Sequence, residues 1–150
     1  MDTKEIINRK ARHDFQVLET LEVGIALKGT EVKSVRQGKA TLAGAFAKID
    51  KKEIWLIGVH IDEYAQGNRY NHDPKRFRKL LLHRAEIAKL FQQCTLKGRT
   101  LIPLKMYFNN RGYAKVQLAV CKGKTGADRR EDIKKRDAER EMRQAMKRRR

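Results

Sequence analysis

With 150 residues, the chain has the length of one ordinary domain, enough to bury about two-thirds of the surface that its unfolded form exposes. Thirty-six Lys and Arg against eighteen Asp and Glu give a formal net charge of +18, which favours a polyanionic partner such as a nucleic acid. No apolar stretch approaches the ~18 residues of a membrane-spanning helix, and residues 1–10 lack a signal peptide's apolar run, so we expect a cytoplasmic protein without a membrane partner.

The first patterned segment is a strand over residues 15–27, where apolar residues fall on one parity. This alternation places Glu22 on the outward face. A short helix is expected over residues 31–37, with Thr30 as its N-cap and Gly38 as its stop.

The middle of the chain predicts a hairpin and then a helical region. Residues 42–49 and 54–61 read as two strands joined by the polar turn 50–53. After a polar loop, Asp73 and Pro74 supply an N-cap and a first helical position. We therefore expect a helix with a basic first part over residues 75–83 and a core-packing second part that ends at Gly98.

The last patterned segments are strands over residues 100–108 and 113–121, and Pro103 indicates an edge or a bulge in the first of them. Beyond residue 121 no apolar periodicity remains, so residues 122–150 form a basic tail that is helix-prone in composition but cannot build a core. We predict a disordered tail that folds into a helix against a partner. Residues 1–121 are expected to form a mainly β, α+β domain, an OB-like antiparallel barrel with packed helices.

Enzyme chemistry has no positive signature in this sequence. The four histidines lie near acids but lack the spacing of a metal site, and no phosphate-binding glycine loop or nucleophile elbow occurs. A nuclease using Asp62, Glu63 and Asp73 with Mg²⁺ is the sharpest enzymatic alternative, although capping already explains Asp73. Cys94 and Cys121 lack paired spacing and are expected to be free thiols. We expect no catalytic residue, metal or cofactor.

Basic and aromatic residues gather in the segment before the second helix half. The cations are Arg69, Lys75, Arg76, Arg78, Lys79 and Arg84, and Tyr64, Tyr70 and Phe77 are interleaved with them. Together they can contact phosphates and stack on bases or riboses, whereas the plainer alternative is a solvated helix face. Glu22 by itself is either a solubility residue or an acceptor for base amino groups and 2′-hydroxyls.

Four strings of residues carry a resemblance to a known family: NRKARHDF at 8–15, GTEVKSVR at 29–36, NHDPKRFRKLLLH at 71–83 and IPLKMY at 102–107. In this order, over about residues 6–136, the chain closely resembles the small protein B family of SsrA-binding proteins. The resemblance implies an OB-like barrel that binds the tRNA-like domain of transfer-messenger RNA (tmRNA, SsrA RNA). It further implies delivery of this alanyl-charged RNA to stalled bacterial ribosomes for trans-translation, by a protein that is not an enzyme.

The resemblance also implies which residues face the RNA. Asn8, Glu22 and Leu81 match family positions that face tmRNA, with Leu81 packing against a nucleotide of the RNA elbow. The surrounding surface that the matching strings predict to bind RNA comprises Arg9, Lys10, Arg12, His13, Glu31, Lys33, Ser34, Arg36, Arg69, Asn71, His72, Lys75, Arg76, Arg78 and Lys79.

In the family the tail enters the 16S rRNA decoding centre and the empty mRNA channel of the 30S subunit. The matching tail residues are Lys122, Gly123, Lys124, Asp128, Arg129, Arg130, Lys134, Lys135 and Arg136. Here the chain departs from the family, which commonly has Lys at the position of Thr125 and an aromatic residue or His at that of Ala127, so stacking by residue 127 is lost.

Further expectations from the resemblance are a monomer and an indirect link to elongation factor Tu through the charged RNA. The alternative from another class is a structural ribosomal or ribosome-assembly protein. It would share the charge and the barrel, and the RNA that co-purifies would discriminate the two.

Overall fold

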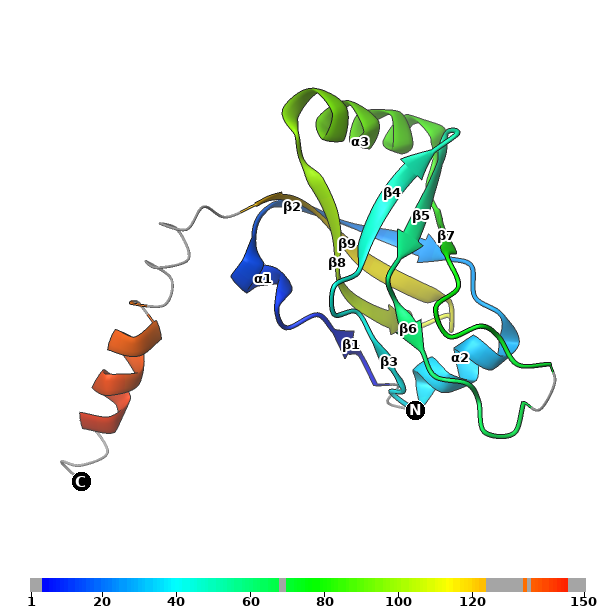
Figure 1. The fold of residues 1–150 in the computed structure, drawn as a ribbon, viewed down its shortest axis with the longest axis horizontal. Helices are drawn as coiled ribbons and strands as arrows, with labels where there is room; N and C mark the ends of the chain where they lie inside the picture. The colour runs from blue at the N-terminus through cyan, green and yellow to red at the C-terminus, as the bar shows by residue number, and fades with distance from the viewer. Residues whose placement is uncertain (1–3, 68–69, 124–133, 135, 146–150) are drawn as a thin grey trace.

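A computed structural model describes residues 4–67, 70–123, 134 and 136–145 of the chain (Figure 1). Its strands are β1 (Ile6–Ile7), β2 (Phe15–Ile25), β3 (Ala40–Thr41), β4 (Phe46–Asp50), β5 (Glu53–Ile57), β6 (His60–Ile61), β7 (Arg78–Leu81), β8 (Thr100–Phe108) and β9 (Ala114–Gly123). Its helices are α1 (Ala11–Asp14), α2 (Gly29–Arg36) and α3 (Arg84–Lys97), and residues 136–145 are also helical. No helix among these residues is long and apolar enough to cross a membrane.

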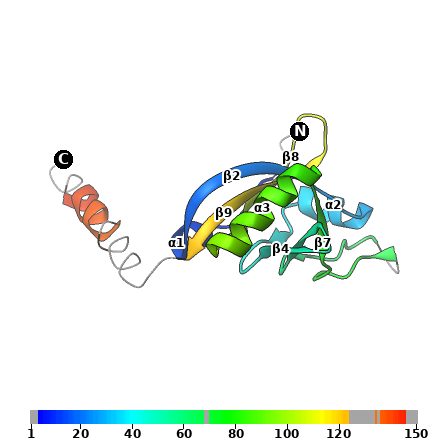
Figure 2. The same cartoon turned by 90° about the horizontal axis from the view of Figure 1, so that it is seen from above.

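The main sheet closes on itself. Its strand order is β1-β8-β4-β5-β7-β2-β9, and β8 also pairs with β9, so six antiparallel strands form a ring to which β1 adds at β8. The helices α2 and α3 lie at opposite ends of this ring (Figures 1 and 2). The predicted α+β fold with an antiparallel barrel and packed helices is therefore confirmed.

Alternation along the strands fills the barrel interior. In β2, Val23 and Ile25 are buried whereas Glu22 between its apolar neighbours is exposed. The same alternation buries Ile54 and Leu56 of β5. The break in periodicity at Glu19 coincides with a register shift between Val17 and Glu19 in the β2–β9 ladder. These strands present one apolar face to the core and one face to solvent.

Two predicted connections form as expected. The β4–β5 hairpin turns at Lys51 and Lys52, both of which have positive φ, as a two-residue hairpin loop requires. Helix α3 ends at Gly98, whose φ of 63° is left-handed. The predicted irregularity at Pro103 is a register shift in the β8–β9 ladder.

The predicted helix over residues 75–83 is wrong. Residues 78–81 form strand β7, which lies between β2 and β5 and completes the ring. Arg78 and Leu80 point into the interior while Lys79 and Leu81 point outward. The alternation of a strand is not visible in this sequence because Arg78, a cation, takes one of the inward positions that apolar residues usually occupy.

Two smaller corrections concern element ends. The N-cap of α2 is Lys28, not Thr30, and the Lys28 backbone N–H donates to the Glu31 carboxylate at 2.7 Å. Strand β9 continues through Lys122 and Gly123, which pair with Gln16 and Phe15 of β2. Strand β9 thus ends two residues past its predicted end at residue 121.

Candidate nucleic-acid interface

The outward faces of β7, β2, β9 and β8 form a continuous row at the level of Gly24. Gly24 of β2 pairs with Leu81 on one side and with Lys115 on the other, and Lys115 pairs with Tyr107. Cross-strand partners share a face of the sheet. A Cβ atom at position 24 would lie 3.2 Å from the Cβ of Leu81, so the glycine leaves room for a leucine that is 52% exposed.

Glu22 lies one step along β2 on the same exposed face, opposite Gln117. The Tyr107 hydroxyl donates a hydrogen bond to Glu22 Oε2. Burial, and then the hydrogen bond and charge of Glu22, raise the pKa of Tyr107 to about 12, so the phenol stays a donor at neutral pH. Lys105 Nζ lies 5.1 Å from the centre of the Tyr107 ring. The carboxylate is thus held in place, with acceptor capacity left for a ligand.

The N-terminal string divides into a buried anchor and an exposed basic arm. The Asn8 side chain is 9% exposed and donates to the Pro103 carbonyl at 2.9 Å, so it ties β1 to β8. Arg9, Lys10 and Arg12 that follow are exposed. His13 is half-buried, 3.0 Å from the Asp14 carboxylate.

Glu31 is the centre of a buried ion-pair cluster. Its carboxylate accepts hydrogen bonds from Arg78 Nε and from an Arg76 terminal nitrogen, both at 2.5 Å. Burial acts to raise the pKa of Glu31, but hydrogen bonds from Arg76, the Lys28 N–H and Arg78 outweigh it and the pKa is lowered. Arg78, fully buried, also donates to the carbonyls of Val59 and Pro74 at 2.9 and 3.0 Å. The cluster fastens α2 to the start of β7 and to the segment before it.

His72 supports the same junction. Its Nε2 lies 2.9 Å from the Ile61 carbonyl and its Nδ1 lies 2.8 Å from the Thr30 hydroxyl. A carbonyl accepts only, so Nε2 donates to the Ile61 carbonyl, and Nδ1 forms the second hydrogen bond with the Thr30 hydroxyl. The side chain is 2% exposed.

Part of the predicted RNA-binding set is buried. Asn8, Glu31, Ser34, His72 and Arg78 are buried, and all of them except Ser34 form side-chain hydrogen bonds within the protein, so they support the surface; their contact with RNA stays a prediction. Consecutive basic residues need not all be exposed. In β7 the side chains alternate, so Arg78 points into the interior and Lys79 points outward.

Other predicted residues do lie at the surface. Lys33 and Arg36 of α2 are exposed and lie over the rings of Tyr64 and Phe108, at 5.3 and 5.1 Å from their centres. Asn71 braces the loop through two hydrogen bonds with the Tyr64 backbone, of 2.6 and 3.0 Å.

The remaining predicted cations of the barrel lie near β7 or outside the described residues. Lys75 is exposed, Arg76 is half-buried and Lys79 pairs with Glu53 at 3.3 Å. Arg69 lies outside the described residues.

The predicted tail residues are only partly described. Lys122 and Gly123 are exposed at the end of β9, and Lys134 and Arg136 are exposed helical residues. Lys124, Asp128, Arg129, Arg130 and Lys135 lie outside the described residues.

Tyr107, Lys105, Lys115 and Gln117 belong to the Glu22 surface but were missed by the sequence reasoning. Their signal was available: in β8 the buried Leu104 and Met106 alternate with Lys105 and Tyr107, which places the latter two outward. What the sequence could not give is the register that sets Tyr107 against Glu22, 85 residues away.

No metal-binding chemistry is supported in the described part of the chain, where no group of three or more His, Cys, Asp or Glu side chains could hold an ion. Both cysteines are free, and burial raises the pKa of Cys121 to about 11, which keeps that thiol protonated. This leaves the outer face of the barrel as the candidate site.

Comparison with known proteins identifies the family to which the chain belongs. Residues 5–148 match the profile of the family described as SmpB protein. The chain belongs to the SmpB protein family. The SsrA-binding protein of Desulforamulus reducens is 56% identical over 139 residues, 93% of this chain and 86% of that protein. The SsrA-binding protein of Bradyrhizobium diazoefficiens is 60% identical over 134 residues, 89% of this chain and 85% of that protein.

A solved SmpB-type structure shares the fold. A chain in the structure described as "tmRNA-SmpB: a journey to the center of the bacterial ribosome" superposes with a TM-score of 0.70 at 48% identity, covering 86% of this chain and 94% of that one. At this identity the similarity extends beyond the fold to the sequence.

Proposed function

We propose that this chain binds the tRNA-like domain of tmRNA and delivers it to stalled ribosomes for trans-translation. The observation that carries the proposal is its likeness over about nine-tenths of its length to proteins called SsrA-binding protein. The SmpB chain from a tmRNA and ribosome structure supports the same partners.

The geometry supports a division of roles on the outer face. Leu81, exposed beside Gly24, offers apolar contact to a nucleotide, and Glu22 offers an acceptor to base or ribose donors. The exposed cations Arg9, Lys10 and Arg12 supply sequence-independent phosphate contacts. Glu22, which Tyr107 holds in place, would repel phosphates. Its presence on so basic a protein is explained if it accepts a hydrogen bond from a base or ribose donor of the RNA.

The tail is proposed to act on the ribosome, its basic residues binding in the decoding centre and the mRNA channel. The described helical residues 136–145 are all exposed, so they are available to a partner. We propose that the protein works as a monomer in the cytoplasm and meets elongation factor Tu only through the charged RNA. No catalytic step is assigned to its own residues.

The test is which RNA the protein selects. Affinity-purified protein should carry tmRNA far above its share of cellular RNA, and a labelled tRNA-like domain should bind the purified chain directly. Mature rRNA in stoichiometric amount, with no tmRNA enrichment, would identify a structural ribosomal protein instead.

A further inference from the structure

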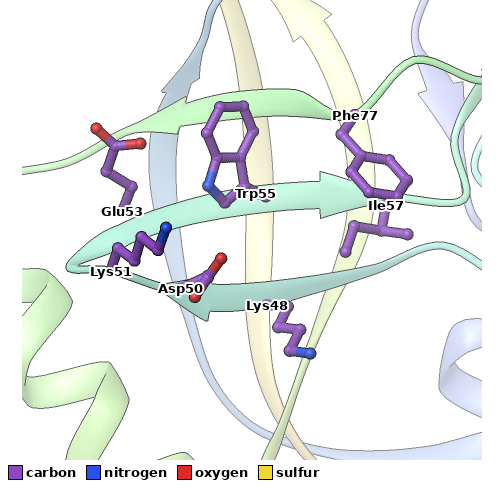
Figure 3. A pocket seen from close by; sticks show the side chains of 7 residues that line it. All are labelled: Lys48, Asp50, Lys51, Glu53, Trp55, Ile57 and Phe77. Carbon is purple, nitrogen blue, oxygen red and sulfur yellow. The ribbon is translucent and has the colours of Figure 1, made fainter.

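The outer face of the β4–β5–β7 part of the barrel carries an aromatic hollow that the Glu22 and Leu81 surface does not include (Figure 3). Its volume is about 360 Å³. The side chains that line it are Lys48, Asp50, Lys51, Glu53, Trp55, Ile57 and Phe77. This size is at the lower end of the ~300–1,000 Å³ of small-ligand sites and suits a single nucleotide.

Strand register arranges these side chains in two rows. In the first row Lys48 of β4 pairs with Trp55 of β5, and Trp55 pairs with Lys79 of β7, so Trp55 stands between two lysine positions. In the second row Phe46 pairs with Ile57, and Phe77 is next in register because Leu56 pairs with Arg78. A flat aromatic side chain is thus flanked by charges on two sides and by apolar groups on a third.

The apolar row is unusually open to solvent for a barrel strand. Phe77 is 57% exposed and Phe46 is 40% exposed, and Trp55 is half-buried. In Figure 3 the Trp55 ring lies between Glu53 on one side and Phe77 with Ile57 on the other. Exposed rings beside lysines are the means by which proteins bind single-stranded RNA: bases stack on the rings and phosphates lie at the cations.

The charges of the hollow fit an anionic backbone. Glu53 is neutralised by Lys79 at 3.3 Å, whereas Lys48 and Lys51 form no ion pair with any residue in the described ranges. Asp50 lies between Lys51 and Lys48 (Figure 3), and it pairs across the β4–β5 ladder with Glu53, so the two acids form a row beside the Lys48 and Trp55 row. Lys48, the strand partner of Trp55, and Lys51 of the turn are thus the cations available to the sugar-phosphate of a nucleotide stacked on Trp55.

The hollow continues directly into the Glu22 and Leu81 surface. Lys79 and Leu81 lie on either side of the buried Leu80 in β7, so both point outward. Leu81 in turn lies beside Gly24 of β2. Because β7 pairs directly with β5, an RNA that contacts Leu81 needs to extend only to the neighbouring β-strand to reach Trp55.

We propose that Trp55 and Phe77 form a stacking site for one unpaired nucleotide of the RNA that contacts Glu22 and Leu81, with Lys48 and Lys51 binding its phosphates. This inference rests on the proposed function, because it takes that RNA to be the tRNA-like domain of tmRNA. The base must be unpaired, since stacking on a protein ring needs a face that no neighbouring base covers.

Trp55 is the only tryptophan of the chain, so its fluorescence reports on the hollow without labelling. Titration of the full-length protein with the tRNA-like domain should quench Trp55 and protect it from acrylamide. In parallel, fluorescence anisotropy of labelled RNA measures binding independently of the hollow. Trp55→Ala should weaken RNA binding about tenfold, within the range of about 5- to 150-fold typical of losing one stacked base. Trp55→Phe should restore most of it.

Phe77→Ala provides a second variant in case Trp55→Ala folds poorly, because Phe77 is largely exposed and outside the barrel core. It should weaken binding by at least about threefold through the loss of part of one stacking contact. Tyr113→Ala is the matched control: Tyr113 is a 64% exposed aromatic residue in the β8–β9 connection, away from the hollow, and its loss should leave affinity unchanged.

The outcomes separate the inference from the function on which it rests. If labelled RNA binds wild type and both alanine variants equally and Trp55 fluorescence does not change, the stacking site is refuted while the function stands. If wild type binds no better than Leu81→Asp, the proposed function itself fails. Quenching by ribosomes but not by the tRNA-like domain would also overturn the inference, since the occupant would then be rRNA.

Discussion

Tyr107 and Glu22, 85 residues apart in the chain, are joined by a hydrogen bond from the phenol to the carboxylate on the outer face of the barrel. Because β9 lies between their strands, the bond spans two ladders whose registers both have to be correct. It fixes one carboxylate oxygen of an exposed residue. A carboxylate fixed in this way loses less rotamer freedom when it meets an RNA donor.

Tyr107→Phe should therefore weaken binding of the tRNA-like domain by about threefold to tenfold, the loss expected for an exposed, charge-assisted hydrogen bond that orients a contact. The fold should be unchanged because the ring remains. Anisotropy titration of labelled RNA measures the effect, with Tyr113→Phe as the control. Spectrophotometric titration provides a second readout: the variant should lose the tyrosine that ionises at about pH 12, whereas equal high-pH profiles would contradict the bond.

Glu22→Ala should also lower RNA affinity, although it makes the protein more positive. In the proposed function its carboxylate accepts from a base or ribose donor instead of meeting a phosphate, so an added net charge cannot replace it. The same titration measures this, with Glu19→Ala as the control: Glu19 is an exposed acid on the same strand, near the β2 bulge. Equal or tighter binding by Glu22→Ala would make Glu22 a solubility residue.

Alternation and turn chemistry predicted most of the barrel, since β2, the β4–β5 hairpin, α3, β8 and β9 all follow local patterns. Strand β7 did not, because Arg78 takes an inward position that sequence patterns reserve for apolar residues. Its charge is balanced by Glu31, 47 residues earlier. Only the folded chain brings the two together, so neither the strand nor the cluster could be read locally.

The candidate site shows the same limit. Glu22 and Leu81 were predicted, and both are exposed. Five other predicted residues are buried. A string of residues shared with a family does not by itself distinguish side chains at the surface from side chains that hold the surface in place. The Trp55 and Phe77 hollow combines residues from β5 and the segment before β7, and no single stretch of sequence carries it.

Glu31→Gln should destabilise the fold by about 3–5 kcal/mol, the cost of leaving a buried charge without its partner. Arg78 would remain in the interior with its guanidinium unbalanced. Denaturant unfolding monitored by Trp55 fluorescence measures the change. Glu53→Gln is the control, since its partner Lys79 is partly exposed and the pair contributes ~1 kcal/mol or less.

The same variant should change the acid dependence of stability. The pKa of Glu31 is lowered in the folded state from an ordinary value of 4.5, so the stability it contributes is present above that value and is lost as pH falls through the folded pKa. Glu31→Gln should therefore lose less stability than wild type on acidification below pH 4.5. Parallel curves for the two proteins would contradict the lowered pKa.

Truncation after Gly123 should separate RNA binding from action on the ribosome. The cut follows the last pair of the β2–β9 ladder, Phe15 with Gly123, so the barrel and its outer face remain complete. Binding of the tRNA-like domain should stay within about threefold of full length, because few of the phosphate contacts lie in the removed part. Tagging of a stalled nascent chain in a reconstituted translation system should fail, since the basic tail is missing.

The conformation of the tail provides an independent check of this division. Residues 136–145 are helical with every side chain exposed, and a helical segment whose described side chains bury no surface gains little stability from packing. Backbone NMR of the free protein should show partial helicity there, and binding to the ribosome should complete it. Charge-neutral substitution of Arg136 and Arg140 should reduce tagging and leave RNA binding intact. If truncation abolished binding of the free RNA, or left tagging unaffected, the barrel and the tail would not divide the work as proposed.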